Sequence, residues 1–116
     1  MQYKRAERVS DQIKREVSEI IQKQVKDPLV GFITVTDAEV TDDLRSAKIF
    51  YSVLGDEKSK TNTKIALERA RDFIQQEIGK RIRIRHLPII TFKYDNSIEY
   101  GARIEELIKR THEQDE

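Results

Sequence analysis

The sequence of 116 residues contains no cysteine and no tryptophan, and it has only two prolines and four glycines. Without cysteine the chain can form neither a disulfide nor a thiolate metal site, which fits a reducing compartment. No segment approaches 18 uninterrupted apolar residues, and no apolar run follows the basic N-terminus. We therefore expect a cytoplasmic protein with no secretion signal and no membrane partner.

The sequence also lacks the common catalytic motifs, including GxxxxGK[ST], GxGxxG, HExxH and GxSxG. His86 and His112 are the only histidines, and both are typical of surface positions, although His86 could also line an RNA surface. The adjacent carboxylates Asp42 and Asp43 are more typical of a solvated turn than of a metal site. We therefore predict no enzyme, no metal and no cofactor. A metal-dependent RNA hydrolase using Asp42, Asp43 and Asp95 is the weakest alternative.

Hydrophobic and charged residues each make up 37% of the chain, a balance that supports a modest core under a highly charged surface. The length fits one domain over residues 1–116, and residues 110–116 are expected to form a frayed acidic tail. The net charge of +1 hides an uneven distribution, because residues 80–93 carry five basic side chains and no acid. Residues 37–57, in contrast, carry six acids and two bases.

The basic stretch of residues 80–93 is the strongest local signal of function. Cations without compensating acids repel one another and are best tolerated beside a polyanion such as RNA. The alternative, an ordinary solvated helix face, stays open at this point. Aromatic residues are few, which favours contacts to the backbone of structured RNA over base stacking. The predicted RNA-binding residues are Lys80, Arg81, Arg83, Arg85 and Lys93, extended by Arg5, Arg8 and Arg15 of the basic N-terminal region.

Hydrophobic periodicity predicts a helix over residues 7–26, a strand over 32–40, a second strand around 47–53, and a long helix over 62–83. A third strand around residues 90–94 and a final helix from about residue 98 follow. The shift of apolar phase between Val35 and Ala38 suggests a bulge in the first strand, which pairs with the second as a hairpin. The predicted fold class is therefore α+β, with three strands and the order α-β-β-α-β-α.

Two short motifs, together with the strand and turn around Asp43-Leu44, carry a family resemblance that covers nearly the whole chain. Lys26-Asp27-Pro28 closes the first helix, and Tyr94-Asp95-Asn96-Ser97 follows the basic helix end and the third strand. With this order of elements, the chain resembles the bacterial ribosome-binding factor A family. We read Asp27, Pro28, Tyr94, Asp95, Asn96 and Ser97 first as structural residues, forming a helix end, a strand end and a helix cap.

The resemblance implies a type II KH-like domain in which a kinked helix with an Ala-x-Gly pattern replaces the RNA-clamping GXXG loop. The matching positions here are Ala70, Arg71 and Asp72, so an aspartate stands where the family pattern has glycine. An acid at this position argues against a phosphate contact there.

The resemblance also implies a function. It implies a non-catalytic assembly factor that binds the immature small (30S) ribosomal subunit and its 16S rRNA. Such a factor supports late maturation and processing of the rRNA 5′ end, and family members often act in cold adaptation. We expect a monomer, with a GTPase as a candidate release partner. The alternative is a protein-interaction module that uses the opposed basic and acidic faces.

Overall fold

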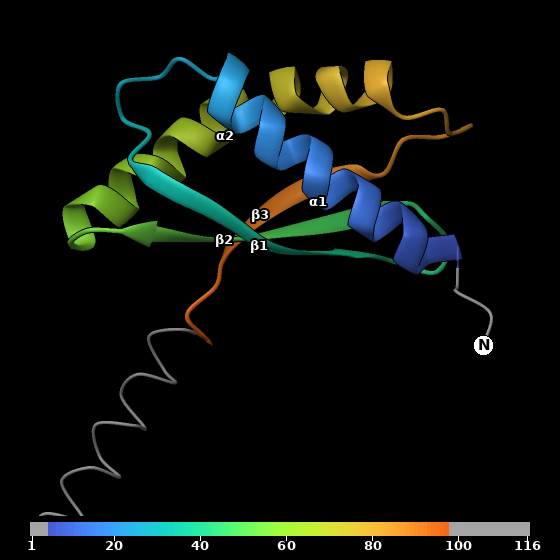
Figure 1. Cartoon of the computed structure of the whole chain (residues 1–116), viewed down its shortest axis with the longest axis horizontal. Helices are drawn as coiled ribbons and strands as arrows, with labels where there is room; N and C mark the ends of the chain where they lie inside the picture. The colour runs from blue at the N-terminus through green and yellow to red at the C-terminus, as the bar shows by residue number, and fades with distance from the viewer. Residues whose placement is uncertain (1–4, 98–116) are drawn as a thin grey trace, which may run out of the picture.

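The computed structural model describes residues 5–97, which form two helices and a three-stranded sheet. The elements are α1 (Arg5–Gln24), β1 (Phe32–Val40), β2 (Ser46–Leu54), α2 (Glu57–Arg81) and β3 (Ile89–Tyr94). Figure 1 shows α1 and α2 on the same face of the sheet. The α+β class and the order of these five elements are confirmed, whereas the predicted final helix and acidic tail lie outside the described residues.

The sheet has the order β1-β2-β3, with β2 in the centre. β1 and β2 form the predicted antiparallel hairpin, and the register shifts between Val35 and Asp37, which confirms the bulge. β3 pairs in parallel with β2, so the chain must cross over between them, and α2 makes that connection. Alternate side chains of the strands therefore point towards the helices, and the others point to the opposite face.

The long helix α2 begins earlier than predicted. Its N-cap is Asp56, whose carboxylate accepts a hydrogen bond from the backbone N–H of Ser59 at 2.9 Å. This cap draws the polar residues from Glu57 onward, which the sequence suggested as a loop, into the first turns. The helix is unbroken to Arg81, and Figure 1 shows that its axis changes direction along its length, as a kinked helix requires. The placement of the kink at residues 70–72 stays a prediction.

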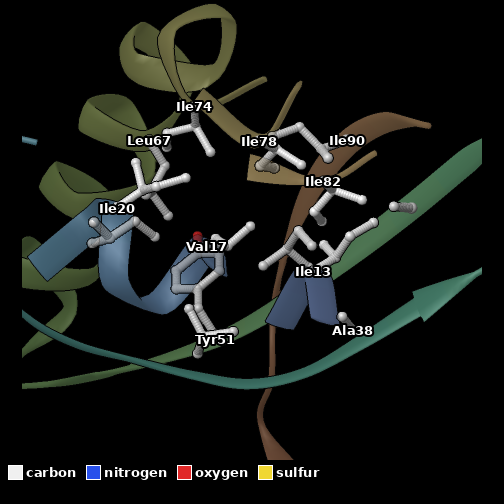
Figure 2. Close-up of a cluster of buried hydrophobic side chains, with 14 of the residues drawn as sticks. Ile13, Val17, Ile20, Ala38, Tyr51, Leu67, Ile74, Ile78, Ile82 and Ile90 are labelled. Carbon is white, nitrogen blue, oxygen red and sulfur yellow. The ribbon is translucent and has the colours of Figure 1, made fainter. Parts of the chain in front are cut away.

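The core lies between the helices and the inner face of the sheet (Figure 2). α1 contributes residues spaced by three and four, and α2 contributes residues spaced by four and seven. Each fully buried aliphatic side chain is worth about 1.5–3 kcal/mol relative to an exposed one. The largest fully buried aliphatic residues are Ile13, Val17, Ile20, Ile49, Leu67, Ile74, Ile78 and Ile90. Within residues 5–97, no helix has the length and apolar character needed to cross a membrane.

Candidate nucleic-acid interface

The segment between α2 and β3, residues 82–88, carries two of the predicted RNA-binding arginines and is fixed at both ends. At its start, Ile82 is buried and its backbone N–H donates to the carbonyl of Ile78 at 2.9 Å. At its end, the side-chain amide of Gln75 donates to the Pro88 carbonyl at 2.6 Å and accepts from the Ile90 N–H at 2.9 Å. The segment is therefore a short, held loop. The alternation of arginine and isoleucine from Arg81 to Arg85 is also typical of a strand, but the structure forms no strand there.

Three arginines from different parts of the chain meet beside this loop. Arg5 begins α1, Arg45 lies in the turn between β1 and β2, and Arg85 belongs to the held loop. Together with His86 they line one hollow of about 330 Å³, and we call these four residues the basic hollow. Figure 1 shows that the start of α1, the β1–β2 turn and the loop after α2 lie at the same end of the molecule.

Hydrogen bonds from nearby residues to Asp43 stabilise the turn that carries Arg45. The Asp43 carboxylate accepts hydrogen bonds from the Thr41 hydroxyl at 2.6 Å and from the Arg45 backbone N–H at 3.0 Å. These bonds lower the pKa of Asp43, whose carboxylate also lines the hollow. The Arg45 carbonyl accepts from the Ile89 N–H at 2.9 Å, which ties the turn to the start of β3.

The cations of the basic hollow are available for a ligand. Among the described residues, the structure places no salt bridge on Arg5, Arg45 or Arg85, and all three are exposed. Sequence reasoning did not find Arg45, because it lies in an acidic stretch of the sequence. Its nearness to Arg85 arises only from the pairing of β2 with β3.

Arg81 differs from its neighbours because it already has protein partners. Its guanidinium donates to Glu16 of α1 at 3.0 Å and lies 3.5 Å from Glu19. The hydrogen bond to Glu16 is the main reason that the pKa of Arg81 is raised. The side chain is only 22% exposed. Its position favours a link between the helices, and the predicted RNA contact at Arg81 stays a prediction.

The other predicted cations are divided between two faces. Lys80 pairs with Glu77 at 3.1 Å, one turn back on α2, and Arg83 is exposed on the held loop. Lys93 lies next to Phe50 on the sheet face opposite the helices. The structure therefore does not bring Lys93 together with Arg83 and Arg85, because residue 93 is at an outward position of β3.

Arg8 and Arg15 extend the cationic surface along α1. Arg8 is three residues after Arg5 and Arg15 a further seven, so all three lie on one side of the helix. Both are exposed. Asp11, which lies between them, reduces the net positive charge of this side.

A sequence model of the family described as ribosome-binding factor A matches residues 5–108. The chain belongs to the ribosome-binding factor A family. A relative of that name from Halothermothrix orenii is 49% identical over 116 residues, covering all of this chain and 95% of the relative. One from Staphylococcus epidermidis is 50% identical over 111 residues, covering 96% of each chain.

Solved structures with the name ribosome-binding factor A share the fold. A crystal structure of the Thermus thermophilus protein has a TM-score of 0.70 at 24% identity, covering 79% of this chain and 97% of that one. A solution NMR structure from Thermotoga maritima has a TM-score of 0.69 at 31% identity, with 79% and 88% covered. A Thermus thermophilus homology model fitted into a cryo-EM map of a 30S complex has a TM-score of 0.62 at 25% identity, with 75% and 91% covered.

In this ribosome-binding factor A family member, the Asp27-Pro28 motif joins the end of α1 to the middle of α2. The Asp27 carboxylate accepts from the Leu29 N–H at 3.0 Å and lies 3.7 Å from Arg69. Ala70 and Arg69 line a hollow of about 460 Å³ with Asp27 and Pro28. Asp72 is 91% exposed, and Arg71 is its neighbour at 3.8 Å. These contacts support a structural role for the motif.

The second motif also makes structural contacts. The Tyr94 ring packs edge-on against Tyr51 with centroids 5.7 Å apart. The Asp95 carboxylate accepts from the Thr36 hydroxyl at 2.6 Å and from the Ser97 N–H at 2.9 Å, and these bonds lower the pKa of Asp95. Asn96 is exposed beside Tyr94. The strand end is thus observed, whereas the helix that this motif was predicted to cap lies outside the described residues.

The part of the chain that the structure describes contains no cluster of three His, Asp or Glu residues that could hold a metal ion. Asp42, Asp43 and Asp95, the carboxylates of the hydrolase alternative, do not form such a group. His112 lies outside the described residues.

Proposed function

We propose that this chain is a ribosome assembly factor that binds the small ribosomal subunit through its rRNA, without catalysis. The convergence of Arg5, Arg45 and Arg85 carries this proposal, because exposed cations from three separate segments line one hollow. A relative fitted into a 30S complex supports the small subunit as partner. Late maturation, support of 5′-end processing and action at low temperature are the roles that we expect within this function.

The basic hollow suits the phosphate backbone of a folded RNA better than a base. Guanidinium groups bind phosphate oxygens through two hydrogen bonds, and they stay charged at every physiological pH. The hollow has no aromatic side chain for stacking apart from His86. We therefore propose that the factor recognises the shape of the rRNA at this point, with Arg83, Arg8 and Arg15 adding longer-range attraction.

The proposed solution behaviour follows from this role. We propose that the factor acts as a monomer in the cytoplasm, and that a GTPase or another assembly protein promotes its release. Because it would bind precursor particles, it should sediment with free small subunits and not with complete ribosomes.

The test compares two double variants with equal loss of charge. Arg45→Gln with Arg85→Gln removes two cations of the basic hollow, and Lys58→Gln with Lys64→Gln removes two exposed cations near the start of α2. Figure 1 shows that the start of α2 lies at the opposite end of the molecule. In gradients of cell extract, the first variant should leave the small-subunit fraction, and the second should remain.

Binding to purified small-subunit rRNA gives the quantitative result. Each lost phosphate contact should reduce the slope of log affinity against log salt by about 0.7–0.9, so the first variant should lose about 1.5. Equal slopes for the two variants would show that the basic hollow is not the RNA contact. Association with small subunits that survives ribonuclease treatment of the isolated complex would favour protein docking instead.

A further inference from the structure

β1 is an edge strand, because the sheet has the order β1-β2-β3. In a strand, the N–H and C=O of one residue point to the same side, and those of the next residue point to the other. The Asp95 N–H donates to the Tyr51 carbonyl at 2.7 Å, so the backbone groups of Tyr51 face β3 and those of Ser52 face β1. Thr34 is the partner of Ser52 and therefore faces back to β2. Its neighbours, residues 33 and 35, then direct their backbone groups to the free edge of the sheet.

Side chains already occupy the later N–H groups of this edge. Beyond the bulge, the Ala38 N–H donates to the Asp37 carboxylate at 2.8 Å. The Val40 N–H donates to the Ser10 hydroxyl of α1 at 3.0 Å. Figure 1 shows that α1 starts near the end of β1, whereas the start of β1 lies at the other end of the sheet. Within residues 5–97, no side chain accepts a hydrogen bond from the N–H of residue 33 or 35.

The first half of β1 also has the composition of a strand with neighbours on both sides. Residues 32–36 are Phe-Ile-Thr-Val-Thr, with four β-branched side chains and no charge. Edge strands are usually protected from further pairing by charged side chains, proline or a covering element. The other edge strand, β3, contains Lys93, and the Gln75 side chain accepts from its Ile90 N–H at 2.9 Å. The described residues give the first half of β1 no such protection.

The open backbone groups match a polypeptide. An extended chain presents an N–H and a C=O at every second residue, so it can pair with both groups of residues 33 and 35. The RNA backbone offers mainly phosphate acceptors, which cannot pair with a C=O. Phe32, at the start of the strand, is 80% exposed and offers an apolar contact to the same segment. The edge therefore suits an extended protein segment.

An acidic hollow of about 350 Å³ continues this edge, and Ala38 and Val40 of β1 help to line it. The acids that line it are Glu7, Asp11, Asp37, Glu39 and Asp42. Lys48 is the partner of Glu39 on β2, but no basic residue among those described lines the hollow itself. The acidic hollow therefore favours lysine or arginine side chains in a segment that lies along β1.

A second copy of this chain fits the edge less well than a basic segment does. Two β1 strands related by a twofold axis would pair antiparallel about Thr34. Residues 27–31 of the copy would then lie beside the acidic hollow. These residues contain Asp27 and no base, so the pairing would bring like charges together.

We propose that the free edge of β1 takes a fourth strand from another protein, an extended segment whose lysine or arginine side chains enter the acidic hollow. An antiparallel segment would reach the hollow with its N-terminal side. The acidic hollow and the basic hollow are neighbours, because Arg5 and Glu7 both begin α1 and because Asp42 and Asp43 are consecutive. The protein segment would thus bind beside the basic hollow without using its arginines.

Hydrogen exchange of the full-length chain, followed by NMR, tests the open edge. In the chain alone, the amides of Ile33 and Val35 should exchange about tenfold faster than that of Thr34, which faces β2. The probe is a synthetic peptide of alternating valine and threonine that begins with three lysines. It should slow the exchange of Ile33 and Val35 about tenfold. The same peptide with N-methylated valine and threonine, which can no longer donate hydrogen bonds, should leave their exchange unchanged.

Paired variants with equal loss of charge test the acidic hollow. Glu7→Gln with Asp42→Asn should weaken binding of the lysine peptide about fivefold, because two acids of the hollow are lost. Glu68→Gln with Asp72→Asn removes two exposed acids of α2 and should leave this binding unchanged.

Several outcomes would overturn the proposal. They are equal exchange of Ile33 and Thr34 in the chain alone, no protection by the lysine peptide, equal protection by the N-methylated peptide, and equal affinity of the two paired variants. Protection that rises with the concentration of the chain alone would also overturn it and would identify a second copy as the occupant. Protection that appears only with rRNA would do the same and would identify RNA.

Discussion

The guanidinium of Arg81 donates to the carboxylate of Glu16 at 3.0 Å and so joins the last turn of α2 to the middle of α1. The two residues are 65 positions apart in the sequence. The contact fixes the direction in which the chain leaves α2, and thereby where the held loop presents Arg83 and Arg85. An arginine within a basic stretch of sequence can thus act as a structural residue.

Replacing Arg81 should therefore act mainly on the stability of the fold. Its effect on the affinity for RNA should be the smaller one. Arg81→Gln leaves Glu16 without its partner and leaves Glu19 with Lys23 alone. We expect a lower melting temperature for this variant than for Lys80→Gln. Glu16→Gln combined with Arg81→Gln should lower it by less than the sum of the two single changes, because one interaction is removed in both. If the two single changes lower the melting temperature additively, the Arg81–Glu16 pair contributes nothing to the stability of the fold.

Replacing Gln75 should lower the free energy of unfolding more than replacing a typical polar surface residue. Gln75→Ala removes a donor and an acceptor that satisfy the Pro88 carbonyl and the Ile90 N–H. Loss of these partners should lower the free energy of unfolding by about 1–3 kcal/mol in chemical denaturation. Gln76→Ala is the control, because Gln76 is exposed. The idea fails if both variants unfold at the same denaturant concentration.

The hydrogen bond between Thr36 and Asp95 should make the stability of the fold depend on pH. The Thr36 hydroxyl is the main cause of the lowered pKa of Asp95, whose ordinary value is 3.8. Because the folded pKa is depressed, the bond stabilises the fold above the unfolded pKa, and this stability is lost as pH falls through the folded pKa. In Thr36→Val, NMR titration should show the Asp95 pKa closer to 3.8. Asp56, whose pKa is lowered by Ser59, should titrate unchanged in the same sample.

Asp72 provides a test of whether α2 needs a flexible residue at the predicted kink. The helix is continuous through this position, so Asp72→Ala should stabilise the fold by up to about 0.6 kcal/mol through helix propensity. Asp72→Gly, which restores the family pattern, should destabilise it by about 0.4 kcal/mol. If glycine instead proved more stable than alanine, the backbone at residue 72 would need a conformation other than the helical one.

Much of the fold could be predicted because its signals are local. The steps of three and four in α1 and the phase shift before Ala38 both follow from side-chain direction alone. The start of α2 was missed because Gly55 to Lys60 looks polar, although Asp56 three residues before Ser59 is a helix cap. A capping residue is a stronger signal than average polarity.

The candidate site was predicted only in part, because charge was counted along the sequence. Arg5 and Arg85 were found in this way, whereas Arg45 was missed in its acidic surroundings. The bond between the Ile89 N–H and the Arg45 carbonyl places these cations together, and it depends on a parallel strand pair across 44 residues. No local pattern carries that information.

The side chain of Gln75 has one more consequence, which concerns association between molecules. β3 is an edge strand, and the first peptide groups of an edge strand are a template for a strand of another chain. The Gln75 amide offers the same donor and acceptor as a backbone peptide, and it occupies the Pro88 carbonyl and the Ile90 N–H. A single side chain thus ends the sheet at this point, and we expect Gln75→Leu to aggregate at concentrations where the natural chain stays dispersed.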